Sequence, residues 1–298
     1  RTGLVAKLRF AVSLLGSVLH ARRLLRQHRA DFVLGVGGYI SAPPVLAAWT
    51  LGIPRAIHEA NVTPGAANRL CARVADFVLL TYETTGPRLP GRAPRHVVGC
   101  PTNPAVSEGD RSAALARYRL SGDRPVLLVV GGSLGAQTIN DLGIALARVP
   151  SRTFDMVLVT GPKYFEQTSK ALEPPPPGVA IIDYEDRMPE AYAAADLALC
   201  RAGSSTLAEL TAVGLASVLV PSPNVTDNHQ EGNARGLEAV GAAEVLVENG
   251  LDIDDAVAAI AALLGDRNRL DAMSRAARAQ YKGDTAGQVA DLIEDRLR

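Results

Sequence analysis

The fold is decided by residues 126–136, VLLVVGGSLGA, where five consecutive apolar residues run into a turn that contains three glycines. A short apolar run that ends at glycine is typical of a buried strand, and a helical pattern follows at once. Similar runs, each followed by a helical pattern, recur at residues 156–160, 179–182, 197–200 and 217–220. This alternation predicts an α/β domain in which helices cover both faces of a parallel sheet.

The first part of the chain shows the same alternation. We expect strands at residues 32–36, 55–58 and 77–81 and helices at residues 43–51 and 65–75. A chain of 298 residues with 47% hydrophobic content is long enough for two such domains, each with its own core.

The boundary between the domains is expected near residues 99–104, because Pro101 and Pro104 cannot continue a helix or a central strand. We therefore predict an N-terminal domain over residues 1–103 and a C-terminal domain over residues 104–283. The last helix, residues 284–298, is expected to pack back on the N-terminal domain.

Charge and cysteine content exclude several classes of protein. The chain has 31 Lys and Arg against 31 Asp and Glu, so no general attraction to nucleic acid is expected. Cys71, Cys100 and Cys200 are far apart and lack metal-ligand spacing, which favours reduced thiols. The early apolar run of residues 10–19 is too short to span a bilayer.

Two glycine-containing turns predict anion binding in the second half. Gly131-Gly132-Ser133-Leu134-Gly135-Ala136 links a strand to a helix, and helix N-termini offer unpaired N–H groups to a phosphate. A merely tight turn is the alternative interpretation. The stretch from Arg201 to Glu209 follows the strand at residues 197–200 in the same way. Glu209 is placed to accept hydrogen bonds from a ribose diol, unless Thr206 and Glu209 form a helix-capping box.

Further polar groups follow other strand ends. Asp227-Asn228-His229-Gln230 offers amide groups, which can both donate to and accept from sugar hydroxyls. In the first half, Gly35-Val36-Gly37-Gly38-Tyr39 is a possible site for a second phosphate-bearing ligand. His58 and Glu59 are candidates for catalytic base and acid. The alternative is a buried histidine that a carboxylate holds in place.

The first 26 residues form a basic amphipathic pattern, which is consistent either with core packing or with contact to an anionic membrane surface. Asp252-Ile253-Asp254 looks like a metal-binding motif but is interpreted as a helix cap.

Five of these motifs resemble, in order and spacing, the MurG family of N-acetylglucosaminyltransferases, over nearly the whole chain. They lie at residues 35–39, 58–69, 131–136, 200–209 and 227–234. The resemblance implies a GT-B fold, in which two Rossmann-like α/β domains with parallel sheets face each other across a cleft. It also implies inverting transfer of N-acetylglucosamine from UDP-N-acetylglucosamine to the muramyl 4-hydroxyl of undecaprenyl-linked lipid I. The product, lipid II, serves peptidoglycan synthesis and thereby cell shape and division.

The same resemblance implies where the ligands bind. Gly37, Gly38 and Tyr39 would contact the acceptor. Helix N-termini would stabilise the leaving UDP, with no obligatory cofactor and a divalent metal at most stimulatory. The enzyme would lie peripherally on the cytoplasmic face of the bacterial membrane. The implied donor-binding residues are Asn61, Gly132, Ser133, Gly135, Arg201, Gly203, Ser204, Ser205, Thr206, Leu207, Glu209 and Gln230.

The sequence departs from the family pattern in three places. Roughly the first sixty to seventy residues of the family, with a strand and a glycine-rich loop, have no counterpart, as judged from the missing βαβ units. Val106 replaces a donor-contacting arginine, and Glu185 replaces an apolar residue near the uracil. Alternatives are a diacylglycerol glycosyltransferase, a UDP-N-acetylglucosamine 2-epimerase or a non-catalytic nucleotide-sugar-binding remnant.

Overall fold

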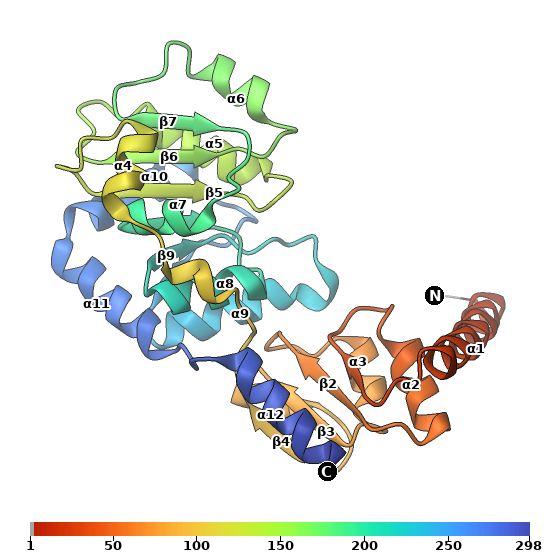
Figure 1. Cartoon of the computed structure of the whole chain (residues 1–298). Coiled ribbons are helices and arrows are strands. Elements are labelled where there is room, and N and C mark those ends of the chain that lie inside the picture. The colour runs from red at the N-terminus through yellow and green to blue at the C-terminus, as the bar shows by residue number, and fades with distance from the viewer. Residues whose placement is uncertain (1–2) are drawn as a thin grey trace. The chain divides into compact units, whose positions relative to one another are not determined.

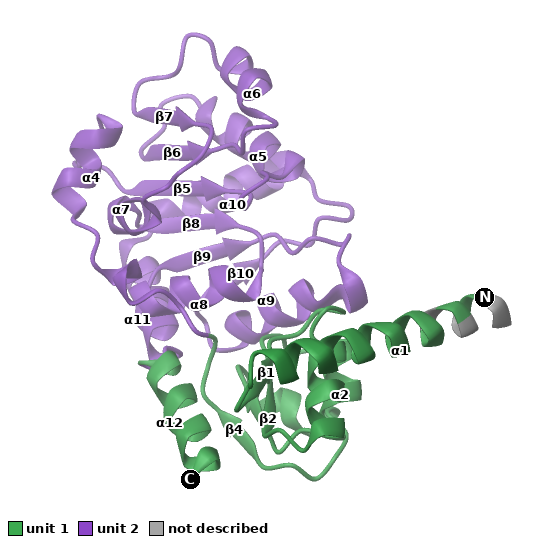
Figure 2. Ribbon diagram, turned by 45° about the vertical axis from the view of Figure 1, so that its right-hand side comes forward, with its two compact units in different colours: residues 1–100, 284–298 green, residues 101–283 purple. Residues whose placement is uncertain are grey.

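The computed structural model describes residues 3–298, and the chain divides into two compact units (Figures 1 and 2). Unit 1 comprises Arg1–Cys100 with Asp284–Arg298, and unit 2 comprises Pro101–Gly283. The predicted boundary after Asn103 lies slightly beyond the observed one. The second domain ends at Gly283, where the sequence analysis placed its end.

Unit 1 is a parallel four-stranded sheet in the order β1-β2-β3-β4. Its second helix begins with two prolines in the first turn and ends at Gly52, whose φ of 72° is left-handed. The elements of unit 1 are α1 (Leu4–Gln27), β1 (Val33–Gly35), α2 (Ala42–Leu51), β2 (Arg55–Glu59), α3 (Ala66–Cys71), β3 (Phe77–Leu80), η1 (Glu83–Arg88), β4 (Arg95–Val97) and α12 (Thr285–Leu297).

The C-terminal helix α12 completes the core of unit 1, as Figure 2 shows by its colour. Val289 of α12 packs with Phe77, Leu79 and Val98 on one face of the sheet. The Thr285 hydroxyl donates to the carbonyl of Val98 at 2.8 Å. The opposite face packs against α2 and α3.

Unit 2 is a parallel six-stranded sheet in the order β10-β9-β8-β5-β6-β7 (Figure 2). Its elements are η2 (Pro104–Ser107), α4 (Arg111–Tyr118), β5 (Val126–Val130), α5 (Gln137–Ala147), β6 (Asp155–Val159), α6 (Phe165–Ala171), β7 (Val179–Ile182), α7 (Met188–Ala194), β8 (Leu197–Cys200), α8 (Ser204–Val213), β9 (Ala216–Leu219), η3 (Thr226–Asn228), α9 (His229–Ala239), β10 (Ala243–Val245), α10 (Ile253–Gly265) and α11 (Arg267–Ala279).

The four inner strands of unit 2, β5, β6, β8 and β9, are buried on both faces because helices cover both sides of the sheet, whereas the edge strands β7 and β10 are partly exposed. In β5, Leu128 and Val130 pack with residues of α4, α7 and α8, whereas Leu127 and Val129 pack with residues of α5 and α10. This explains why the strands are continuous apolar runs rather than alternating ones. Val106, which replaces the family's arginine, is buried in the first of these two clusters.

Asp252 is a helix cap, as predicted. Its carboxylate accepts from the backbone N–H groups of Asp254 and Asp255 at 2.9 and 3.1 Å, at the start of α10. Its side chain thus satisfies the unpaired donors of that helix.

Candidate functional site

The strand order of unit 2 reverses between β5 and β8. The chain runs from β5 to β6 and β7 on one side and returns to β8, β9 and β10 on the other. Val130 and Cys200, the last residues of β5 and β8, lie side by side in register. Ligands of open parallel sheets bind at such a switch point, beyond the carboxyl ends of the strands.

Two helices begin at this switch point, and neither has a side-chain cap. The N-cap residue of α5 is Ala136 and that of α8 is Gly203, and neither has a side chain that accepts a hydrogen bond from the first N–H groups of its helix. The first N–H groups of a helix have no partner within the helix. Both helix starts therefore present donors and a partial positive charge to an anion.

The loop between β5 and α5 requires glycine at two places. Gly132 and Gly135 have φ angles of +93° and +74°, in the region that L side chains rarely adopt. A Cβ on Gly135 would lie 2.1 Å from the carbonyl oxygen of Thr160, whereas a Cβ on Gly132 would meet nothing within 4 Å. Gly135 thus lets two loops approach each other, and Gly132 borders open space.

A cavity of about 260 Å³ is lined by the loop that precedes α5, at Gly132 and Ser133, and by Thr206 and Glu209 of α8. Five predicted donor-binding residues line it, and Tyr184 of the loop between β7 and α7 forms a further wall with Met188 and Tyr192 of α7. The lining residues are Val130, Gly132, Ser133, Val159, Tyr184, Glu185, Met188, Tyr192, Arg201, Thr206 and Glu209.

Glu209 is fixed at one carboxylate oxygen. The Tyr192 hydroxyl donates to Oε2 at 2.7 Å. Burial, together with the negative charge of Glu209, raises the pKa of Tyr192, so this hydroxyl keeps its proton.

The capping-box interpretation of Thr206 and Glu209 is wrong, because α8 already begins at Ser204.

Arg201 lines the cavity but is paired with Glu248. Its Nη1 donates to Oε2 of Glu248 at 2.5 Å and to the carbonyl of Val220 at 3.0 Å. Burial alone would raise the pKa of Glu248, but hydrogen bonds from Arg201 and from the Thr138 hydroxyl lower it below its usual value. This ion pair ties the turn after β8 to the loop after β10, and the hydrogen bond from Thr138 ties that loop to α5.

The other predicted donor residues of unit 2 are not among those that line the cavity. Gln230 accepts from the backbone N–H of Ser222 at 2.9 Å, and the Ser204 hydroxyl accepts from buried Asn233 at 3.2 Å. The side chain of Leu207 belongs to the core, and its N–H donates to the carbonyl of Gly203 at 3.0 Å. Gly135, Gly203 and Ser205 also lie outside that lining set.

Unit 1 contains the predicted acceptor residues and Asn61. Gly37 and Gly38 have φ angles of +90° and +71°, and Tyr39 is 84% exposed. Asn61 donates through its backbone N–H and its amide to Oε1 of Glu59, at 3.0 and 3.2 Å.

The catalytic interpretation of His58 and Glu59 does not fit their surroundings. Both side chains are buried, and Nε2 of His58 lies 2.8 Å from the carbonyl oxygen of Gly99. Oε2 of Glu59 accepts from the backbone of Gly65 and from the Asn68 amide, at 3.0 and 2.8 Å. Glu59 thus stabilises the turn between β2 and α3. The alternative, a buried histidine that a carboxylate holds in place, is right about the burial of His58, but the hydrogen-bond partner of its ring is the Gly99 carbonyl.

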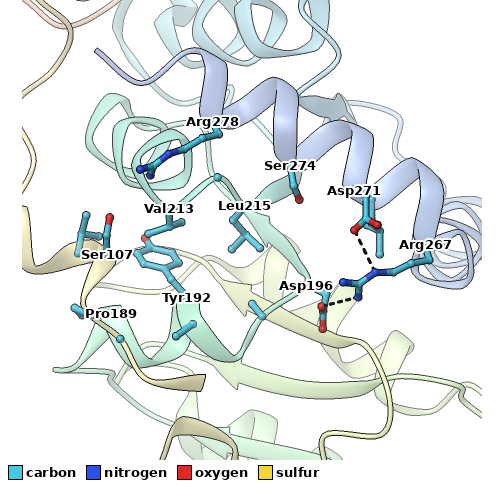
Figure 3. Close-up of a pocket in the computed structure, with 16 residues that line it drawn as sticks. Ser107, Pro189, Tyr192, Asp196, Val213, Leu215, Arg267, Asp271, Ser274 and Arg278 are labelled. Atoms are coloured by element: carbon cyan, nitrogen blue, oxygen red, sulfur yellow. Dashed lines mark hydrogen bonds and ion pairs between the residues drawn. The ribbon is translucent and has the colours of Figure 1, made fainter. Parts of the chain in front are cut away.

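A larger hollow of about 420 Å³ lies at the opposite edge of the same sheet, beside Asp196 and Leu215, which come just before β8 and β9. Figure 3 shows Arg267, Asp271 and Ser274 of α11 facing it. Arg267 is paired with Asp196 and Asp271, both at 3.1 Å. Because its charges are paired and it lies at the amino ends of the strands, this hollow is not the site that the fold predicts.

Two parallel-sheet α/β units, one of which carries a cavity at its switch point, are the architecture of the GT-B fold, and the family comparison identifies the chain as a glycosyltransferase. The glycosyltransferase family 28 C-terminal domain matches residues 126–291, and the N-terminal domain of the same family matches residues 1–80. The chain belongs to glycosyltransferase family 28.

Named relatives support this membership. The chain is 40% identical to the UDP-N-acetylglucosamine--N-acetylmuramyl-(pentapeptide) pyrophosphoryl-undecaprenol N-acetylglucosamine transferase of Clavibacter sepedonicus, over 98% of this chain and 78% of that protein. It is 38% identical to the transferase of the same name from Symbiobacterium thermophilum, with the same coverage. The predicted resemblance to the MurG family is thereby confirmed.

Solved structures agree with the fold. The structure of Acinetobacter baumannii MurG matches with a TM-score of 0.78 and 29% identity, over 96% of this chain and 80% of that one. A putative UDP-N-acetylglucosamine 2-epimerase from Listeria monocytogenes matches with a TM-score of 0.72 over 95% of this chain and 78% of that one. At 14% identity, the second match shows a shared fold alone.

The sequence analysis missed the wall formed by Tyr184, Met188 and Tyr192. A strand end at residue 182 gave a signal for Tyr184 and Met188, since side chains that follow strands of a parallel sheet gather at one edge. No local pattern pointed to Tyr192, which lies seventeen residues before its partner Glu209.

Proposed function

We propose that the chain transfers N-acetylglucosamine from UDP-N-acetylglucosamine to the muramyl 4-hydroxyl of lipid I, with inversion, and so forms lipid II. The names of its relatives support this choice of substrates. The observation that carries the donor half is the cavity lined by the loop before α5 and by α8, with Glu209 held by Tyr192.

The donor is proposed to bind with its diphosphate at Gly132, Ser133 and the start of α8. The ribose diol is proposed to contact Glu209, because a carboxylate can accept from two hydroxyls. The uracil is proposed to pack against Tyr184 and Met188, whose side chains suit the flat faces of a base.

The chemical step is proposed to be a single displacement. The muramyl 4-hydroxyl attacks the anomeric carbon, the bond from that carbon to the diphosphate oxygen breaks, UDP leaves with the bonding electrons, and the hydroxyl proton is released to solvent. The N–H groups at the starts of α5 and α8 stabilise the charge that develops on the diphosphate. No covalent intermediate and no obligatory metal are part of this proposal.

Unit 1 is proposed to bind the lipid acceptor at a membrane surface, with Gly37, Gly38 and Tyr39 at the acceptor site. Val12, Leu15 and Leu19 lie three and four residues apart on α1 and are 63%, 61% and 58% exposed. That spacing places them on one side of the helix. The side chains of Leu4, Val5, Lys7, Leu8 and Phe10, which belong to the same predicted pattern, lie outside the described part.

Exposed arginines lie on the same helix, including Arg9, Arg23 and Arg26. An exposed apolar stripe with neighbouring positive charge suits the headgroup region of an anionic bilayer. Within residues 3–298, no helix is both long enough and apolar enough to cross a membrane. We propose peripheral contact at the cytoplasmic face.

The test is a transfer assay with radiolabelled UDP-N-acetylglucosamine and a lipid I analogue. A disaccharide-containing lipid product is expected, and Ser133→Ala and Glu209→Ala are expected to reduce its formation. Full activity of both variants would contradict the donor site. Turnover of the donor without acceptor would instead indicate an epimerase.

A further inference from the structure

Glu185 places a carboxylic acid in the wall of a cavity that is proposed to hold a diphosphate. A carboxylate pointing into that space would repel the ligand. The side chain of Glu185, however, is 0% exposed, while the whole residue is 4% exposed. What position 185 presents to the cavity is therefore main chain, and its carboxylate is turned away.

The carboxylate is held between α4 and the loop that precedes α7. Its Oε2 accepts from the Tyr118 hydroxyl at 2.6 Å. Its Oε1 accepts from Nη1 of Arg117 at 2.9 Å and from the backbone N–H of Arg187 at 2.7 Å. Arg117 compensates the buried charge, and both oxygens have donors, which is the condition for a stable buried carboxylate.

Arg117 and Tyr118 are the last two residues of α4, and neither lines the cavity. They are connected to its wall through Glu185. Arg117 reinforces the connection by also pairing with Glu190 of α7, at 3.0 Å. The loop from β7 to α7 is thus tied to a helix outside the site.

We propose that Glu185 is a positioning residue for donor binding. By anchoring the β7–α7 loop to Arg117 and Tyr118, it holds Tyr184 and Met188 as the wall against which the nucleoside lies. This inference rests on the proposed function, since it assigns the nucleoside end of the same donor site. The diphosphate end, at Gly132 and Ser133, does not depend on the anchor.

The test uses Tyr118→Phe, which removes one hydroxyl outside the cavity. Loss of a hydrogen bond to a buried charge is expected to raise the KM for UDP-N-acetylglucosamine about tenfold, with kcat unchanged. Inhibition by inorganic pyrophosphate, which lacks a nucleoside, is expected to stay the same. A purely structural role would lower the amount of active enzyme and leave KM unchanged.

Arg111→Met is the matched control. Arg111 also lies on α4, but it pairs with Asp196 at 2.8 Å and has no contact with the β7–α7 loop among the described interactions. This variant is expected to lose stability and to keep the wild-type KM.

A double-mutant cycle with Glu185→Leu completes the experiment. Because Tyr118 is proposed to act through Glu185, the double variant is expected to be no worse in donor KM than the poorer single variant. Additive losses, a weakened pyrophosphate inhibition, or a folded Tyr118→Phe enzyme with KM within about twofold of wild type would overturn the inference. Wild-type protein that binds no UDP-N-acetylglucosamine would overturn the proposed function, and the inference with it.

Discussion

Replacing Tyr192 with phenylalanine isolates the contribution of one hydroxyl to the donor site. The ring still fills its place in the core, but the donor at 2.7 Å from Oε2 of Glu209 is lost. Glu209 then regains side-chain rotamers that it must give up again when the ribose binds. The entropy of ordering a glutamate is about 1.5 kcal/mol, so the KM for UDP-N-acetylglucosamine is expected to rise about tenfold.

Steady-state kinetics at saturating lipid I analogue measure this KM, and thermal unfolding checks the fold. Glu209→Gln is the companion variant, because it keeps the shape and can still accept from Tyr192. A folded Tyr192→Phe enzyme with an unchanged KM would show that Glu209 needs no such support, or that it does not contact the donor.

Three further predictions concern the loop, the buried histidine and the first helix. Gly135→Ala places a methyl group 2.1 Å from the Thr160 carbonyl oxygen at a φ of +74°. The free energy of unfolding, measured by denaturant titration, is therefore expected to fall by about 2 kcal/mol or more. The control Gly132→Ala meets no neighbour, and its free energy of unfolding is expected to fall less. Burial lowers the pKa of His58 from its ordinary value of 6.5, although the Gly99 carbonyl and the Glu59 charge act in the opposite direction. As the pH falls below 6.5 the unfolded chain takes up the proton first, so the free energy of unfolding is expected to decline. Unfolding experiments at about pH 7.5 and 5.5 measure this decline, and His58→Gln is expected to make it smaller. The triple variant Val12→Ser, Leu15→Ser, Leu19→Ser is expected to cosediment less with vesicles rich in anionic lipid and to keep its melting temperature. Unaltered vesicle binding would refute the proposed membrane face.

The strands of the larger sheet could be predicted because their chemistry is local. Residues 126–130, 179–182 and 197–200 are apolar on both faces, and they form β5, β7 and β8 with the predicted bounds. Two edge strands were missed. Arg95–Val97 and Ala243–Val245 have three residues each and no apolar run, so only pairing with a neighbouring strand identifies them.

The candidate site was only partly predictable, for a related reason. Sequence position places His58 and Glu59 at a strand end, but it does not reveal that the donors of Gly65 and Asn68 will fold back onto the carboxylate. The helix expected over residues 65–75 also ends early, at Cys71. Side chains such as Glu185 face inward or outward according to partners far away in the chain.

The path of the chain through α12 has a consequence for biosynthesis. Unit 2 is one continuous stretch, so a ribosome can deliver all of it before it synthesises residues 284–298. Unit 1 cannot cover Phe77, Leu79 and Val98 until residues 284–298 have emerged. We therefore expect unit 2 to mature first during translation, with unit 1 left open to chaperones until α12 has emerged.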